Sequence, residues 1–131
     1  MPSAVLSNIL YVEDDPDIQE VAKMSLEMLG GYTLEVCSSG AEAVEAAKTF
    51  EADLILLDVM MPDMDGPTTL TALREFPKML NVPVVFMTAK VMPADIDHYK
   101  AMGAVDVISK PFDPMALAAR ISEIWKNCHD G

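Results

Sequence analysis

The chain has 131 residues, the length of one ordinary domain, and 51% of its residues are hydrophobic, which excludes an intrinsically disordered protein. Nine Lys and Arg against 21 Asp and Glu give a net charge of -12, and a surface of that sign repels phosphate backbones and anionic lipid headgroups. We therefore expect no direct binding to nucleic acid or to a membrane surface.

No segment of the chain predicts a membrane span or an export signal. The longest uncharged stretches, residues 1–12 and 79–89, are shorter than the roughly 20 apolar residues that a spanning helix needs. No Lys or Arg precedes Lys23, so the basic start of a signal peptide is missing. Cys37 and Cys128 stand far apart without the spacing of a metal site. These features predict a cytoplasmic protein with two reduced thiols.

Short apolar runs alternate with segments of helical periodicity along the whole chain. The apolar runs predict strands at residues 8–12, 32–37, 54–57, 82–87 and 106–109. Apolar residues at helical spacing predict helices at residues 16–29, 41–50, 66–76, 93–103 and 114–128. Asp15 and Asp113 each precede a proline at the start of a predicted helix, so we expect both to act as caps.

This strict alternation predicts the fold class and the number of domains. Each right-handed crossover returns the chain over the sheet, so five pairs predict an α/β fold, a (βα)5 doubly wound parallel sheet with helices on both faces. No repeat, low-complexity run or linker divides the chain. We therefore expect one domain over residues 1–131, with its core at about residues 8–128 and no output domain.

Side chains that can bind ligands or take part in a reaction gather where the predicted strands end. Glu13 and Asp14 follow the first strand, Asp58 ends the third, Thr88 follows the fourth, and Lys110 follows the fifth. In a doubly wound sheet the ligand crevice lies at this edge. Any one of these groups is readily explained as a helix cap or a solvated loop residue, but their joint placement favours a functional site.

The charges and ligand types of these groups predict a magnesium site and a nucleophile. If the three carboxylates meet beside Lys110, two negative charges remain uncompensated, and a divalent cation restores the balance. Mg²⁺ prefers oxygen ligands, so Asp14 and Asp58 with a loop carbonyl suit it. Asp58 follows a rigid apolar strand and is placed to attack phosphorus, while Mg²⁺, Lys110 and Thr88 neutralise charge.

Four ordered motifs make the chain resemble the response-regulator receiver family. They are ILYVEDD at residues 9–15, DVMMPDMDG at 58–66, MTA at 87–89 and KPF at 110–112. The resemblance covers about residues 8–128 and implies a single receiver domain with a flavodoxin-like sheet in the strand order 2-1-3-4-5. It also implies a two-component signalling protein with no enzyme activity beyond self-catalysed phosphotransfer and autodephosphorylation.

The resemblance further implies roles for individual residues. Asp58 is expected to accept the phosphoryl group of a phosphohistidine, and Thr88 and Lys110 are expected to contact that group. The implied magnesium ligands are the acidic pair Glu13 and Asp14, the acceptor Asp58, and the backbone carbonyl of Met60. The cofactor implied by this set is Mg²⁺ alone.

The implied partners are a histidine kinase or histidine phosphotransfer protein as phosphodonor, and an unknown output protein. Phosphorylation is expected to switch the surface that binds the output protein, and the receiver is expected to be a stand-alone monomer. A phosphorelay intermediate and the receiver fragment of a longer regulator are alternatives that share the same site.

Three positions depart from the common family pattern or tune it. Val107 stands where the family usually carries Tyr or Phe, so we expect the aromatic rotamer switch to be absent. Met60 and Lys90 occupy positions that influence the lifetime of the acyl phosphate in the family. We expect slow loss of the phosphoryl group, because Met60 cannot align an attacking water.

Three functions of other kinds fit the sequence less well. A Mg²⁺-dependent phosphohydrolase with an Asp nucleophile needs a second Asp two residues later, where this chain has Met60. An FMN carrier on the same fold needs a phosphate-binding loop rich in Ser, Thr or Gly after the first strand, where residues 13–15 are acidic. A pseudo-receiver would not need the complete set of active-site side chains that is present here.

Overall fold

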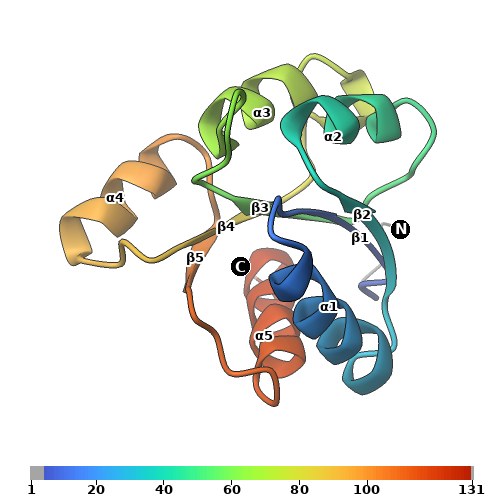
Figure 1. Ribbon diagram of the computed structural model, residues 1–131, viewed down its shortest axis with the longest axis vertical. Coiled ribbons are helices and arrows are strands. Elements are labelled where there is room, and N and C mark those ends of the chain that lie inside the picture. Colours follow the sequence, from blue (N-terminus) through green and yellow to red (C-terminus); the bar gives the residue numbers. More distant parts are fainter. Residues whose placement is uncertain (1–4, 131) are drawn as a thin grey trace.

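The computed structural model describes residues 5–130, which contain five parallel strands in one sheet (Figure 1). The strands are β1 (Asn8–Val12), β2 (Thr33–Cys37), β3 (Leu54–Asp58), β4 (Val84–Thr88) and β5 (Asp106–Ser109). Their order across the sheet is β2-β1-β3-β4-β5. The predicted fold class and strand order are therefore confirmed.

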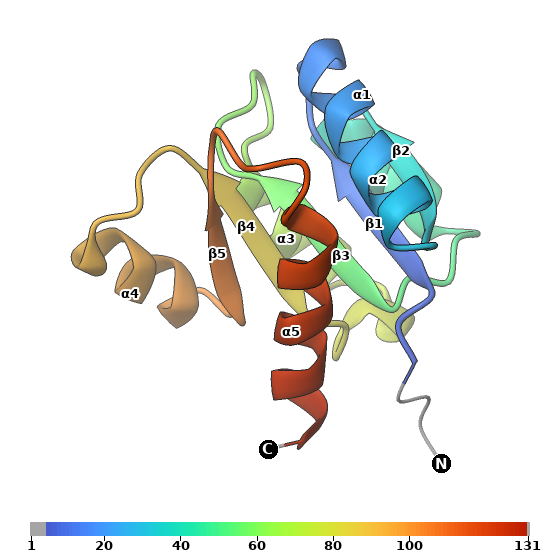
Figure 2. The same cartoon turned by 90° about the horizontal axis from the view of Figure 1, so that it is seen from below.

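Helices cover both faces of this sheet. They are α1 (Pro16–Met24), α2 (Gly40–Ala47), α3 (Gly66–Leu73), α4 (Pro93–Ala101) and α5 (Leu117–Asp130). Figures 1 and 2 show α1 and α5 side by side on one face, α2 and α3 on the other, and α4 beside β4 and β5. No helix within the described residues is long and apolar enough to cross a membrane.

The central strands supply much of the core because both of their faces are covered. All five residues of β3 and all five of β4 are buried. Leu54 and Leu56 face α1 and α5, whereas Ile55 and Leu57 pack with residues of α2 and α3. This alternation follows from the two-residue period of a strand. Asp58 is the next residue of the first series, so its side chain leaves the sheet on the side of α1 and α5.

The helix predicted over residues 16–29 changes its geometry partway along. α1 ends at Met24, and Ser25–Leu29 continue as a π-helix. The hydroxyl of Ser25 donates a 2.6 Å hydrogen bond to the carbonyl of Pro114, in the loop before α5. This contact joins the π-helix to the loop before α5 and involves residues far apart in sequence, so helical periodicity gave no signal for it.

The other predicted helices also differ from the structure at their ends, and α4 ends at Ala101 rather than at residue 103. α2 ends at Ala47 rather than at residue 50. α3 ends at Leu73, and Pro77–Met79 form a separate 3₁₀ turn, because the position before a proline disfavours helical geometry. α5 begins at Leu117 rather than at residue 114, and residues 114–116 form a turn. The carboxylate of Asp113 accepts a hydrogen bond from the backbone N–H of Met115 in this turn, as a capping side chain does.

Candidate functional site

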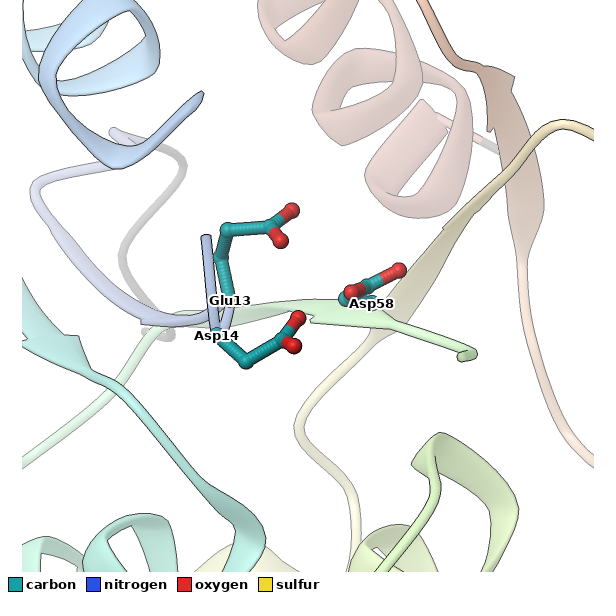
Figure 3. Close-up of side chains that lie close together, drawn as sticks. All are labelled: Glu13, Asp14 and Asp58. Carbon is teal, nitrogen blue, oxygen red and sulfur yellow. The ribbon is translucent and has the colours of Figure 1, made fainter. Parts of the chain in front are cut away.

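Three carboxylates gather at the end of the sheet where the parallel strands finish (Figure 3). Glu13 and Asp14 directly follow β1, and Asp58 is the last residue of β3, the neighbouring strand. One oxygen from each carboxylate lies within 4.8 Å of the other two. Glu13 and Asp58 are buried, whereas Asp14 is open to solvent. The predicted acidic cluster is therefore present, with one member at its mouth.

Lys110 reaches this cluster from the loop after β5. Its ammonium nitrogen lies 3.0 Å from Oε1 of Glu13 and 3.2 Å from Oδ1 of Asp58. The backbone N–H of Lys110 donates a 2.9 Å hydrogen bond to the carbonyl of Thr88, which anchors the loop to the end of β4. One cation thus bridges the two buried carboxylates, which come from different strands.

The electrostatic balance of the site is unfavourable for two buried anions. Burial raises the pKa of Glu13 to about 7, although the hydrogen bond from Lys110 opposes this shift. Burial also raises the pKa of Asp58 against the attraction of Lys110. Burial alone would lower the pKa of Lys110, but its contacts with Glu13 and Asp58 raise it. A second cation would favour the ionised forms of both carboxyl groups.

One oxygen of the Asp58 carboxylate lacks a protein partner. Oδ1 accepts from Lys110, but Oδ2 is buried and has no hydrogen-bond partner among residues 5–130. A buried carboxylate oxygen without a donor is costly. The unpartnered oxygen and the all-oxygen donor set fit a hard divalent cation such as Mg²⁺.

The loop after β3 is folded back tightly against the end of that strand. The N–H of Gly66 donates to the carbonyl of Val59 at 2.9 Å, and Val59 donates to the carbonyl of Met87 in β4. A Cβ on Gly66 would lie 2.6 Å from the carbonyl oxygen of Asp58, closer than atoms can approach. The absence of a side chain at Gly66 therefore allows the loop to pack this closely against the backbone of Asp58. The Met60 carbonyl stays a predicted ligand on this loop.

Thr88 ends β4 and is buried, but its hydroxyl is engaged elsewhere in this structure. Its Oγ1 accepts a 3.1 Å hydrogen bond from the backbone N–H of Lys90. No hydrogen bond within the described residues joins Thr88 to Asp58. The predicted residue is thus at the predicted strand end, where its hydroxyl oxygen accepts a hydrogen bond from the loop between β4 and α4.

Two further contacts support Glu13, and neither was predicted from the sequence. The side-chain amide of Gln19, on α1, donates to the backbone carbonyl of Glu13 and to the hydroxyl of Ser38. The backbone N–H of Asp15 donates to Oε2 of Glu13 at 3.2 Å. Gln19 lies on the helix that follows the motif, and its residue type alone carries no signal for this contact.

Val107 lies beside Phe86 in the sheet, and Phe86 contacts an aromatic ring of α4. Val107 is buried in the core beneath α4, together with Phe86 of β4 and Tyr99 of α4. The rings of Phe86 and Tyr99 meet edge to face, with centroids 5.5 Å apart and planes at 76°. The aromatic contact at this position therefore joins β4 to α4 and does not involve β5.

The chain matches known proteins along most of its length. The family described as "Response regulator receiver domain" matches residues 9–122. The chain is 40% identical over 115 residues to the transcriptional regulatory protein YvrH of Bacillus subtilis (strain 168), covering 88% of this chain and 47% of YvrH. It is 32% identical over 117 residues to the response regulator Rre1 of Synechocystis sp., covering 89% of this chain and 51% of Rre1. The chain thus spans about half the length of these curated relatives.

Solved structures of similar proteins share the fold over nearly their whole length. The chemotaxis response regulator CheY4 of Vibrio cholerae superposes with a TM-score of 0.83 at 28% identity, covering 92% of this chain and 99% of CheY4. The receiver domain of the sensor histidine kinase PA1611 from Pseudomonas aeruginosa PAO1 gives a TM-score of 0.79 at 31% identity, covering 94% and 99%. That structure has a magnesium ion coordinated in its active site cleft.

Proposed function

The chain belongs to the family of response regulator receiver domains, which are signalling phosphoacceptors rather than classical enzymes, and we propose that Asp58 is its phosphoacceptor. The observation that carries this proposal is the buried Oδ2 of Asp58, which has no hydrogen-bond partner within residues 5–130. Such an oxygen is suited to an incoming electrophile or cation. The phosphodonor is a phosphohistidine of a histidine kinase or a histidine phosphotransfer protein.

The same site suits Mg²⁺ as cofactor. The proposed donors are the carboxylates of Glu13, Asp14 and Asp58 and the backbone carbonyl of Met60, all of them oxygen, which Mg²⁺ prefers. When bound, the ion supplies positive charge to the carboxylates and to the oxygens of the transferred group. Asp14 is the member that solvent reaches, so it is the first carboxylate that an entering ion meets.

Phosphoryl transfer forms one bond and breaks one. A carboxylate oxygen of Asp58 attacks phosphorus, the P–N bond of the phosphohistidine breaks, and the ring nitrogen leaves with the electron pair. Lys110 is already 3.2 Å from the carboxylate and turns toward the oxygens of the phosphoryl group. The tight loop through Gly66 holds Asp58 at the strand end, so the nucleophile is oriented before the donor arrives.

We propose that the signal leaves the site through Thr88. Its side chain turns so that the hydroxyl donates to an oxygen of the phosphoryl group and no longer accepts from the N–H of Lys90, which releases the loop between β4 and α4. The surface formed by α4, β5 and α5 then changes, and a partner protein binds it. Because the chain carries a net charge of -12, we propose that the output partner is a protein rather than a nucleic acid. We also propose that the receiver is a monomer and acts in the cytoplasm.

Incubation with Mg²⁺ and acetyl phosphate, followed by intact-mass measurement, tests this assignment. The wild-type chain should gain one phosphoryl group that hydroxylamine removes, as expected for an acyl phosphate. Asp58→Asn should keep the fold and gain none, because the amide has nearly the same shape but no nucleophilic charge. Asp63→Asn, in the same loop, is the matched control and should label normally. Full labelling of Asp58→Asn, or an adduct that resists hydroxylamine, would contradict the proposal.

A further inference from the structure

Tyr11, the next-to-last residue of β1, carries a buried hydroxyl without a partner within residues 5–130. Its side chain has no exposed surface and packs with residues of α1 and α5. Two side-chain atoms in the described part of the chain are buried without a hydrogen-bond partner, and they are the Tyr11 hydroxyl and Oδ2 of Asp58. A phenylalanine would bury the same ring without this penalty. The hydroxyl therefore calls for an explanation beyond packing.

The direction of β1 places this hydroxyl on the same side of the sheet as the Glu13 carboxylate. Residues two apart on a strand share a face and lie about 7 Å apart along it, a gap that the rotatable bonds of a glutamate can cover. Burial, followed by the negative charges of Glu13, Asp58 and Asp15, raises the pKa of Tyr11. The phenol is thus a protonated donor in the field of the carboxylates of the site.

Both oxygens of Glu13 have donors in this structure, but one of these donors, Lys110, is shared with Asp58. Oε2 accepts from the backbone N–H of Asp15, and Oε1 accepts from Lys110. Under the proposed function Lys110 turns toward the phosphoryl group. Oε1 of Glu13 would then lose the hydrogen-bond donor that it has in this structure. A carboxylate oxygen that binds Mg²⁺ still has a lone pair for a donor, and Glu13 has no exposed surface through which water could supply one.

We propose that the Tyr11 hydroxyl is a positioning group that donates a hydrogen bond to Glu13 when Lys110 leaves it for the phosphoryl group. This inference rests on the proposed function, since it requires Lys110 to change partners. It assigns the unpartnered hydroxyl to the phosphorylated state, in which it replaces the ammonium at Oε1. Glu13 thereby keeps two donors in both states, and the acidic pair keeps its geometry.

Tyr11→Phe separates this role from a purely structural one. The phosphoryl analogue beryllofluoride, titrated by ¹⁹F NMR at constant Mg²⁺, measures the phosphorylated-like state. Loss of one hydrogen bond to a charged group should weaken beryllofluoride binding about ten-fold. Mg²⁺ affinity without beryllofluoride should change less than about two-fold, because Lys110 still donates its hydrogen bond to Glu13. The melting temperature should not fall, since the removed hydroxyl has no partner in the resting state.

A double-mutant cycle with Glu13→Gln shows whether Tyr11 acts through Glu13. The neutral amide removes the charge from the proposed hydrogen bond, so the effect of Tyr11→Phe should shrink to about three-fold or less. Tyr32→Phe, a partly buried tyrosine outside the site, is the matched control and should match wild type.

Three outcomes would overturn the inference. These are wild-type beryllofluoride affinity in Tyr11→Phe, an equal loss in the Glu13→Gln background, and a lower melting temperature that accounts for the weaker binding. If wild type binds no beryllofluoride and Asp58 gains no phosphoryl group, the proposed function itself fails. If wild type does both and Tyr11→Phe behaves identically, only the role of Tyr11 fails.

Discussion

The ammonium of Lys110 lies 3.0 Å from Oε1 of Glu13, and the same ammonium contacts Asp58, so one cation is shared by two buried carboxylates. Under the proposed function, phosphorylation of Asp58 brings more negative charge to the site, draws Lys110 toward it and breaks the resting contact between Lys110 and Glu13. How easily Lys110 moves to the phosphoryl group therefore depends on the charge of Glu13 as well as on the charge of Asp58.

Without Mg²⁺, ionisation of Glu13 should make the protein less stable as the pH rises. The folded-state pKa of Glu13, about 7, exceeds its ordinary value of 4.5 because burial disfavours the charge. The folded chain holds this proton more tightly than the unfolded chain does, so stability is lost as the pH rises from about 4.5 to about 7. The loss is at most about 3 kcal/mol. The raised pKa of Asp58 acts in the same direction.

Urea denaturation from about pH 5 to about pH 8 measures this dependence. Glu13→Gln should flatten the profile, whereas Glu45→Gln, at an exposed position on α2, should leave the slope unchanged. Mg²⁺ should restore stability most at the upper end of the range, because it binds the ionised carboxylates. Equal slopes in wild type and Glu13→Gln would refute the prediction.

Asp14 and Asp15 should contribute very differently to Mg²⁺ affinity although they are adjacent. The carboxylate of Asp15 caps α1 by accepting from the N–H of Asp17 at 2.9 Å, as predicted from the sequence. Asp14 is instead part of the acidic cluster. Asp14→Asn should weaken Mg²⁺ binding by at least about ten-fold, while Asp15→Asn, which still caps the helix, should change it little. Calorimetric titration of both variants checks this, and equal affinities would contradict the division of roles.

Thr88→Ala should allow phosphorylation of Asp58 but prevent the change from reaching α4. In the resting structure the Thr88 hydroxyl holds the N–H of Lys90, and this exchangeable bond is the proposed link to the loop before α4. Amide shifts induced by beryllofluoride should extend to α4 in wild type and stay near Asp58 in the variant. Thr68→Ala, at an exposed threonine of α3, is the control and should behave as wild type does. Shifts in α4 that survive Thr88→Ala would exclude this route.

The sequence predicted the fold and the convergence of the site because both follow from periodicity. Apolar runs such as residues 54–57 that alternate with helical segments favour strands buried on both faces of a covered parallel sheet, and parallel strands end at one edge. The partners of individual groups could not be predicted in this way. The bond from Lys110 to Glu13, the commitment of Thr88 to Lys90, and the unpartnered hydroxyl of Tyr11 depend on loop geometry and side-chain rotamers.

Gly66→Ala should damage the site and the fold together. The added Cβ would lie 2.6 Å from the carbonyl oxygen of Asp58, which belongs to the backbone and cannot move aside freely. We expect a loss of about 2 kcal/mol or more in the free energy of unfolding, with weaker Mg²⁺ binding. Gly31→Ala is the control, since its Cβ meets nothing within 4 Å and its φ of 72° costs about 1 kcal/mol. That variant should keep Mg²⁺ affinity, and an unaffected Gly66→Ala would disprove the steric argument.

The lifetime of the acyl phosphate should depend more on Met60 than on Lys90. The Met60 side chain is 66% exposed, on the loop that leaves Asp58, and its thioether offers a water no useful hydrogen bond. Met60→Asn provides an amide that can align an attacking water, which should speed dephosphorylation about ten-fold, the effect of one hydrogen bond in the transition state. Lys90 contacts Thr88 through its backbone N–H, which Lys90→Glu preserves, and its exposed side chain can remain in solvent.

Loss of the phosphoryl group after removal of acetyl phosphate, followed by intact mass, measures these rates. Met28→Asn is the matched control, because Met28 is 77% exposed on the π-helix and belongs to no part of the site. It should dephosphorylate as wild type does, and Lys90→Glu should change the rate by less than about three-fold. A Met60→Asn variant no faster than wild type would show that water alignment at this position does not limit hydrolysis. A larger effect of Lys90→Glu than of Met60→Asn would instead show that the charge of Lys90, in the loop after β4, controls the lifetime of the acyl phosphate.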